Sequence, residues 1–371
     1  MLRLPTYEDL SKEQDEILDL PLDANHIIVG PPGTGKTVMA IHRARMLHEK
    51  RNEPTLILMY NRLLCAYTSA AIEGIGIDGM ATTFHSWFPK FFKDVYGSAP
   101  AKVDRYTFDW LACLQVITSR PLPPKKKYHL LVDEGQDMPK ELYFLLPHIS
   151  QTLTVFADEN QSITGDQSTI AEIKAATGIT EVHTLTLNYR NTLPIAKLAA
   201  SFHVGIKTGI AKVADTGRSG NLPVLDADPS MSSAVMRLVN LESSRSSEPI
   251  GVLVFRKDIQ KKLYNRLLGK TKRKPQIYSS DEAVMNGRDA VDWTKPGIKI
   301  VAFASAKGLE FNTVILPEFQ AFTLDPDSVR CRMMLYVLVS RARKELFITY
   351  SGEGTPPSVG KFDMSLLDDR R

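Results

Sequence analysis

The sequence predicts an α/β fold made of two halves, each built on a mostly parallel β-sheet. A short apolar run, His26 to Val29, leads through a glycine-rich loop into a helix-like segment. A second apolar run, Tyr128 to Val132, ends in two acidic residues. The rest of the chain alternates strand-like runs with helical or polar segments, at 250–255, 298–303, 314–316 and 346–348. We expect the halves to span residues 1–190 and 191–371.

The glycine-rich loop reads Gly30-Pro31-Pro32-Gly33-Thr34-Gly35-Lys36-Thr37. Glycines let the backbone turn and approach a phosphate closely, and the start of the following helix favours an anion. Lys36 would place a cation on the β- and γ-phosphates, and the Thr37 hydroxyl would hold Mg²⁺. Because a strand precedes the loop and a helix follows it, we expect a nucleoside triphosphate site. Its expected residues are Gly30, Gly33, Thr34, Gly35, Lys36 and Thr37.

The second motif is Asp133-Glu134-Gly135-Gln136-Asp137. The run before it is apolar on both faces, which is typical of a buried parallel strand. Ligands bind at the carboxyl ends of such strands, so Asp133 is expected to reach the Mg²⁺ and Glu134 to orient and deprotonate the attacking water. An acidic loop on a solvated edge is the alternative for this motif alone, but the phosphate loop favours the catalytic interpretation.

Six further motifs follow in order. They read Tyr60-Asn61-Arg62, Thr83-Phe84-His85-Ser86-Trp87, Asp158-Glu159-Asn160-Gln161, Leu187-Asn188-Tyr189-Arg190, Gly308-Leu309-Glu310-Phe311 and Ser340-Arg341-Ala342-Arg343. The series resembles the UvrD/Rep-type superfamily 1 DNA helicases from Leu10 to Tyr350. The resemblance implies two RecA-like P-loop NTPase domains with ATP and Mg²⁺ in the cleft between them. The segments 88–127 and 256–297 are too short for the large accessory insertions of that family, so the chain resembles a compact member.

The resemblance also implies roles for single residues. Gln14 would read the adenine edge, Tyr189 would stack on the base, and Glu310 would accept from the ribose hydroxyl. Gln161 would sense the γ-phosphate, while Arg190 and Arg341 would reach it as arginine fingers from the same chain. The catalytic set is therefore expected to be Lys36, Asp133, Glu134, Gln161, Arg190 and Arg341.

Nucleic-acid contacts are expected at Tyr60, Asn61, Arg62, Thr83, His85 and Ser305. Phe84 and Trp87 suit either base stacking or core packing. Where the family has an aromatic residue after its Gln161 counterpart, this chain reads Thr164-Gly165-Asp166-Gln167, so one stacking platform is missing. A run of cations without an acid could bind phosphates or could be a solvated face: Lys261, Lys262, Arg266, Lys270, Lys272, Arg273 and Lys274.

Composition agrees with a two-domain nucleotide-binding protein. The 371 residues are 43% hydrophobic and 24% charged, enough for two ordinary cores. No apolar stretch approaches membrane-spanning length and no signal-like core is present, so we expect a cytoplasmic protein with no membrane partner. The three cysteines, Cys65, Cys113 and Cys331, are too dispersed for a disulfide framework or a metal site. A net charge of +4 permits nucleic-acid binding without demonstrating it.

These observations predict an ATP-dependent DNA helicase or single-strand translocase, with 3′-to-5′ polarity implied by the resemblance. The expected partner is single-stranded or tailed duplex DNA, although RNA also fits because no residue visibly reads a 2′-hydroxyl. The alternative is a nucleic-acid-sensing ATPase switch that gates a separate effector, such as a nuclease in DNA repair or phage defence. A small-molecule kinase would make the later motifs coincidental.

Overall fold

The computed structural model describes residues 4–51, 53–104, 107–122, 127–158, 168–204, 212–213, 219–279, 291–293 and 295–371. The chain forms two compact units. The N-terminal unit comprises Arg3–Thr186 with Ile206–Gly209. The C-terminal unit comprises Leu187–Gly205 and Ile210–Arg371 with the first two residues.

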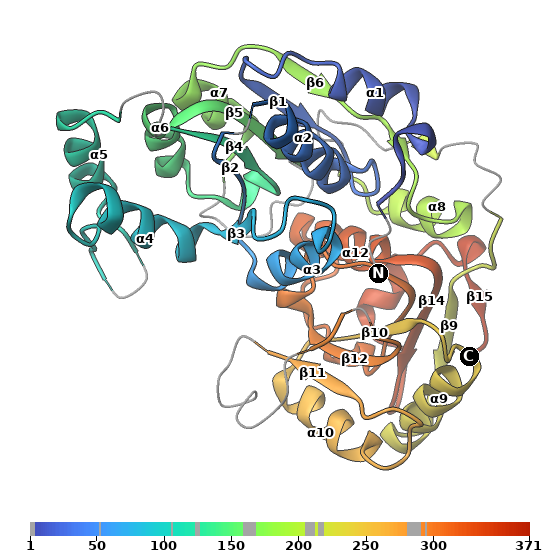
Figure 1. Cartoon of the computed structure of the whole chain (residues 1–371). Coiled ribbons are helices and arrows are strands. Elements are labelled where there is room, and N and C mark those ends of the chain that lie inside the picture. The colour runs from blue at the N-terminus through green and yellow to red at the C-terminus, as the bar shows by residue number, and fades with distance from the viewer. Residues whose placement is uncertain are drawn as a thin grey trace. The chain divides into compact units, whose positions relative to one another are not determined.

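A six-stranded sheet forms the centre of the N-terminal unit (Figure 1), in the order β3-β2-β4-β5-β1-β6. Its strands are β1 (His26–Val29), β2 (Thr55–Met59), β3 (Ala81–Thr83), β4 (Tyr128–Val132), β5 (Ser150–Ala157) and β6 (Val182–Thr184). All of its strand pairs are parallel. The predicted strands at 26–29 and 128–132 are thereby confirmed, and their carboxyl ends lie at one edge of the sheet.

Helices flank this sheet and bury its apolar faces (Figure 1). They are α1 (Lys12–Leu18), α2 (Lys36–Arg51), α3 (Arg62–Ile72), α4 (Phe84–Tyr96), α5 (Trp110–Ser119), α6 (Lys140–Ile149) and α7 (Ile170–Thr177). Phe84 is fully buried and Trp87 is 9% exposed. Both pack in an aromatic cluster with Phe88, Phe91 and Trp110, so core packing is the correct alternative for these two rings.

The C-terminal unit has a seven-stranded sheet in the order β11-β12-β10-β13-β14-β9-β15. Its strands are β9 (Val224–Ala227), β10 (Pro249–Val254), β11 (Gln276–Tyr278), β12 (Gly297–Ala302), β13 (Phe311–Leu316), β14 (Ala342–Tyr350) and β15 (Asp368–Asp369). All pairs are again parallel. β7 (Leu187–Asn188) and β8 (Lys212–Val213) form a separate parallel pair.

Four helices accompany the second sheet among the residues described: α8 (Leu193–Ser201), α9 (Met231–Ser244), α10 (Lys257–Leu267) and α12 (Val329–Ser340). The apolar sides of α9 and α10 pack with β10 and β12 in one core. The fold class predicted from the sequence, α/β with two parallel sheets, is therefore confirmed. Nowhere in the described chain is a helix both long enough and apolar enough to span a membrane.

Candidate nucleotide site and nucleic-acid surface

The loop between β1 and α2 has the backbone geometry that phosphate binding requires. Gly33 and Gly35 have φ angles of 88° and 90°, a region that residues with a Cβ rarely adopt. Position 30 has no room for a side chain, because a Cβ on Gly30 would lie 2.8 Å from Thr34 Oγ1 and 2.9 Å from the Leu185 carbonyl oxygen. The three glycines therefore fix a tight loop whose amide groups precede the first turn of α2.

The Lys36 ammonium lies inside this loop. Its Nζ donates to the carbonyl oxygens of Gly30 at 2.6 Å and Pro31 at 3.3 Å, and lies 3.8 Å from Asp158 Oδ2. Lys36 and Asp158 are both buried. A cation held by the loop's own oxygens is placed to exchange them for phosphate oxygens.

The end of β4 meets the start of α2 through one hydrogen bond. Thr37 Oγ1 donates to Asp133 Oδ2 at 2.8 Å, and the Glu134 amide donates to Asp133 Oδ1 at 3.1 Å. Burial and then the neighbouring Glu134 raise the pKa of Asp133 to about 7, against the lowering effects of Thr37 and Lys36. A hydroxyl and a carboxylate are hard oxygen donors that suit Mg²⁺. The described part of the chain holds no cluster of three metal-ligating side chains, so bound phosphate and water would supply the remaining oxygens.

Glu134 is one of two non-glycine residues described with a positive φ, at 52° with ψ 48°. Gln136 Nε2 donates to its Oε2 at 2.6 Å. The other end of the same fully buried amide, Gln136 Oε1, accepts from the Asp158 amide at 2.8 Å. Gln136 thus connects the expected general base to the end of β5. Gln136 is a residue that sequence reasoning missed, and its position two residues after Glu134 is the signal that could have found it.

Gln14 lies against the phosphate loop. Its Nε2 donates to the Thr34 carbonyl oxygen at 3.1 Å, and its Oε1 accepts from the Ser11 amide at 3.1 Å. A Cβ on Gly35 would lie 2.5 Å from Gln14 Nε2. Buried Arg43, which sequence reasoning missed, donates to the carbonyl oxygens of Ile17 in α1 and of Leu20 and Pro21 just after it. This arginine fixes α1, and with it Gln14, to α2.

Three expected site residues of the C-terminal unit have partners within that unit: Arg190, Glu310 and Arg341. Arg190 forms an ion pair with Glu310, its expected neighbour at the ribose. Arg341 is 1% exposed and donates to the carbonyl oxygens of Val337 at 3.0 Å and Leu309 at 3.4 Å. Tyr189 follows β7, whereas Gln161 falls outside the described residues.

Asn191 connects the two arginine motifs, and sequence reasoning missed it. Its Oδ1 accepts from Asn188 Nδ2 at 2.8 Å, and its Nδ2 donates to the carbonyl oxygens of Ser340 and Ala342 on either side of Arg341. The position directly after Arg190 was the only sequence signal.

The expected nucleic-acid contacts of the N-terminal unit divide into two kinds. Asn61 Oδ1 accepts from the Leu63 amide at 2.8 Å and Thr83 Oγ1 from the Ser86 amide at 3.3 Å, so both side chains cap helices. By contrast, Tyr60 is 45% exposed, and its ring centre lies 5.1 Å from that of His85. Arg62 is exposed. Ser305 lies in the C-terminal unit, at the end of the 3₁₀ turn Phe303–Ser305 that follows β12.

Lys102 adds a cation that the sequence did not indicate. Its Nζ lies 5.3 Å from the centre of the Phe108 ring, which is stacked with the His85 ring at 6.4 Å. Burial of the ring, and then Arg62 and Lys102, lower the pKa of His85, so the imidazole is neutral near pH 7. Two exposed cations and a Tyr60–His85 ring pair form a surface suited to a nucleic-acid strand.

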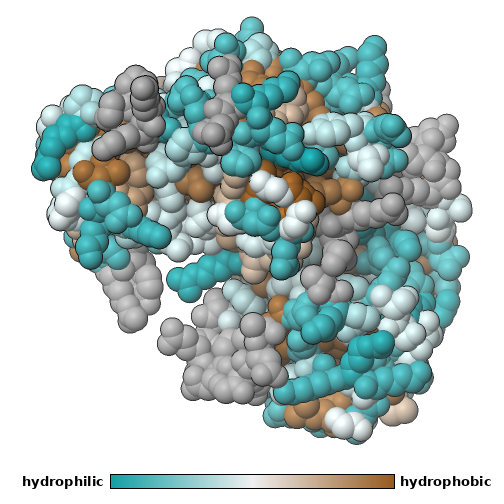
Figure 2. Space-filling model, in the orientation of Figure 1, coloured by the Kyte–Doolittle hydropathy of each residue, from teal (hydrophilic) through white to brown (hydrophobic). Residues whose placement is uncertain are grey.

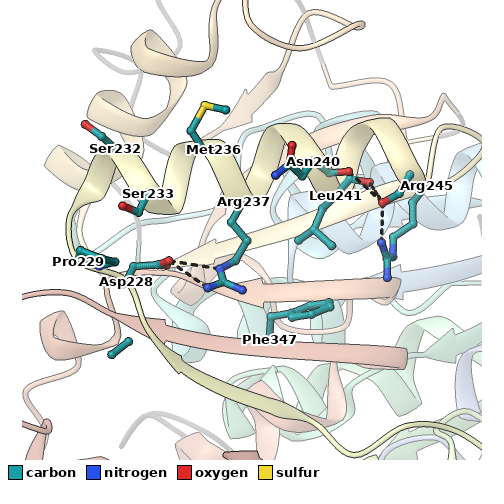
Figure 3. A pocket seen from close by; sticks show the side chains of 12 residues that line it. Asp228, Pro229, Ser232, Ser233, Met236, Arg237, Asn240, Leu241, Arg245 and Phe347 are labelled. Atoms are coloured by element: carbon teal, nitrogen blue, oxygen red, sulfur yellow. Dashed lines mark hydrogen bonds and ion pairs between the residues drawn. The ribbon is translucent and has the colours of Figure 1, made fainter. Parts of the chain in front are cut away.

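A cavity of 840 Å³ lies along α9 in the C-terminal unit (Figure 3). Asp228 and Arg237 point toward one another in it, with an Nε to Oδ1 distance of 3.3 Å, and Arg237 also pairs with Asp226. Arg245 pairs with Glu345. Because acids neutralise both arginines, the described residues that line this cavity offer a phosphate no uncompensated cation.

Comparison with known proteins agrees with the geometry. A family model described as an AAA domain matches residues 14–167, and one described as a UvrD-like helicase C-terminal domain matches residues 303–349. No curated protein sequence matches the chain.

Helicases are among the solved structures that are similar to this chain. The Pif1 helicase from Candida albicans aligns with a TM-score of 0.54 and 13% identity over 94% of this chain and 96% of its own. Two Pif1 helicases coordinating at forked dsDNA give 0.44 at 12% identity over 91% and 92%. The C-terminal domain of a possible DNA helicase from Lactobacillus plantarum WCFS1 gives 0.36 at 22% identity over 49% and 99%. The first alignment shows a shared fold of two RecA-like domains.

The AAA match contains the phosphate loop and the Asp133-Glu134 pair, and the UvrD-like match contains Arg341. With these matches and this fold, the chain belongs to the superfamily 1 helicases.

Proposed function

We propose that this protein is an ATP-driven motor that moves along single-stranded DNA in the 3′-to-5′ direction and separates duplex ahead of it. The observation that carries the proposal is the connected set of buried groups at the phosphate loop. Lys36 lies in the loop, Thr37 bonds to Asp133, and Gln136 holds Glu134. Each group has the chemistry that one part of ATP hydrolysis needs.

Lys36 neutralises charge on the β- and γ-phosphates. Thr37 and Asp133 would hold Mg²⁺, whose charge would further neutralise the phosphate oxygens. The Glu134 carboxylate accepts the proton of the attacking water. The amide of Gln136 donates to one oxygen of that carboxylate and so fixes its orientation.

Arg190 and Arg341 supply charge stabilisation at the transferred phosphate, a role that comes from the family resemblance. For this role ATP binding must displace the partners they now have, Glu310 for Arg190 and the Val337 and Leu309 carbonyls for Arg341. Such an exchange makes the catalytic arrangement depend on the bound nucleotide, which is what a motor requires.

The strand is held in the N-terminal unit by stacking on Tyr60 and by the cations Arg62 and Lys102. Stacking on an aromatic ring tolerates any base, so this contact suits a motor that moves along arbitrary sequence. Asn61 and Thr83 cap α3 and α4, and so fix the positions of Tyr60, which directly precedes Asn61, and of His85, which lies in the first turn of α4.

Steady-state ATP hydrolysis with single-stranded DNA of increasing length tests this function. We expect stimulation that grows with strand length in the wild type. Glu134→Gln should bind ATP normally and lose at least about a hundredfold in kcat, because general-base catalysis contributes about 10²–10⁴. Duplexes with a 3′ or a 5′ tail then test direction, and exclusive unwinding from a 5′ tail would contradict the proposed polarity.

Compactness favours a second candidate, an ATPase switch that gates a separate effector. Only α10, β11 and the residues before β12 separate β10 from β12, which leaves no room for a large accessory domain in that segment. Turnover that DNA stimulates to the same extent at every strand length, with no unwinding of either tailed duplex, would favour the switch over the motor.

A further inference from the structure

We propose that α10 and the turn after it form a docking surface for duplex DNA phosphates, here called the α10 surface: Lys261, Lys262, Arg266, Lys270, Lys272, Arg273 and Lys274. This surface would give the proposed motor a contact with duplex DNA. The proposal rests on the proposed function only for the choice of DNA as the partner.

The helix presents these cations because its other side is buried. Ile259, Leu263 and Leu267 pack into the core with β10 and β12. Gln260, fully buried, donates from Nε2 to the carbonyl oxygens of Tyr278 at 2.6 Å and Ile300 at 3.2 Å. The apolar stripe and this amide therefore fix the orientation of α10 over the sheet.

The turn after α10 is fixed by a buried acid. Glu242 of α9 is 0% exposed, and its Oε2 accepts from the Lys272 amide at 3.1 Å. Arg273 Nη1 lies 3.6 Å from Glu242 Oε1. One buried carboxylate thus holds the turn that carries Lys270, Lys272 and Lys274, all three of which are exposed.

The spacing of the cations suits a phosphate backbone. Lys262 and Arg266 are one helical turn apart, which places them about 6 Å apart along the axis. Phosphates of one strand of B-DNA repeat about every 3.4 Å along the duplex axis, so two steps match that distance. Lys262 has one acidic neighbour, Asp258 at 3.6 Å, in an exposed pair of little strength.

The surface around α10 favours nucleic acid over a membrane or an apolar peptide. Figure 2 shows mainly hydrophilic side chains where Figure 1 places α9 and α10, with small hydrophobic patches between them. Leu268, directly after α10, and Met236, on α9, are the exposed large apolar residues among those described in these two segments. Two separate side chains give neither membrane insertion nor a peptide groove enough apolar area.

The test compares two triple variants of the full chain that change charge equally. The first is Lys262→Gln, Arg266→Gln and Lys270→Gln. The control replaces three exposed lysines outside the surface, Lys12, Lys140 and Lys344, by glutamine. Binding of a blunt, labelled 30-base-pair DNA is measured without nucleotide over a range of salt concentrations, and ATPase stimulation by oligo(dT) is measured in parallel.

We expect the α10 variant to lower the slope of log K against log salt by about 2.7, that is about 0.9 for each phosphate that the three side chains no longer neutralise. The control should keep the wild-type slope, and stimulation by oligo(dT) should stay within twofold for both. An unchanged slope in the α10 variant, or an equal loss in the control, would overturn the proposal. So would equally tight, variant-sensitive binding of polyglutamate. If oligo(dT) did not stimulate the ATPase of the wild type, the proposed motor function would be contradicted and not the α10 surface, because duplex binding is measured separately.

Discussion

Glu134 and Glu318 share an unusual local structure. Both have positive φ angles, 52° and 54°, and both follow a buried parallel strand. Each accepts at Oε2 from the glutamine two residues later, at 2.6 Å from Gln136 and 2.8 Å from Gln320. A left-handed non-glycine residue costs about 1–3 kcal/mol, so surrounding contacts must hold it. The position after a strand end is therefore what gives both residues this backbone conformation. The expected role of Glu134 as general base depends in addition on its neighbours Asp133 and the phosphate loop, which Glu318 lacks.

The amide of Gln136 offers a test of that positioning. In Gln136→Leu, Glu134 loses a donor and the buried Asp158 amide loses its acceptor. We expect kcat for ATP to fall by about tenfold to a hundredfold, because small misplacements of a catalytic group have effects of this size. The affinity for nucleotide, measured by titration, should change by less than about threefold, since Lys36 and the loop remain.

Gln320→Leu is the matched control, because it removes the same local hydrogen bond from Glu318 in the other unit. It should leave kcat unchanged. Equal losses in the two variants would mean that Gln136 acts through general stability and not through Glu134.

At the scale of single elements, β12 contains a buried lysine that makes the free energy of unfolding depend on pH. Lys299 is 2% exposed, and its ammonium donates to Gln276 of the neighbouring β11. Burial lowers the pKa of Lys299 to about 8. Below that pH the folded state contains a charged, desolvated lysine. Between about pH 8 and the unfolded pKa of about 10.4 the unfolded chain binds more protons, so this group makes stability rise with pH.

Lys299→Met should therefore stabilise the C-terminal unit by about 2 kcal/mol at pH 7, because it removes the desolvation of the charge. The gain should shrink by pH 9.5, where the wild-type lysine is largely neutral. Denaturant unfolding at both pH values measures it. Lys344→Met on β14, whose side chain is 62% exposed, should show neither the gain nor its pH dependence. A less stable Lys299→Met at pH 7 would contradict the argument.

At the scale of the whole molecule, the two units have separate sheets and cores. The phosphate loop, Asp133 and Glu134 all belong to the N-terminal unit. A nucleotide held by these groups should therefore stabilise that unit first. At a hundred times its Kd, Mg²⁺ with a non-hydrolysable ATP analogue should add about 2.7 kcal/mol to the free energy of unfolding.

Hydrogen exchange can locate this stabilisation. We expect slower exchange in 30–37 and 128–134, with Lys36→Ala abolishing the effect. Protection confined to the C-terminal unit, or retained in Lys36→Ala, would contradict the assigned site.

The fold class and the backbone geometry of the loop before α2 could be predicted from the sequence alone. The runs before Gly30 and Asp133 are short, apolar and bounded by motifs with strict local geometry. The bounds of the two strands could therefore be predicted to within a few residues. Glycines at a phosphate loop are likewise a local requirement, confirmed by the φ angles of Gly33 and Gly35.

The pairs of residues that hydrogen-bond to one another could be identified only from the tertiary structure. The hydrogen bond from Thr37 to Asp133 joins residues 96 apart, and that from the Asp158 amide to Gln136 joins residues 22 apart. The cap roles of Asn61 and Thr83, the buried position of Arg341 and the place of Lys102 beside Phe108 also appear only in the fold. Residue type and spacing specify local backbone geometry, whereas such pairings depend on how strands order in a sheet, which no local pattern encodes.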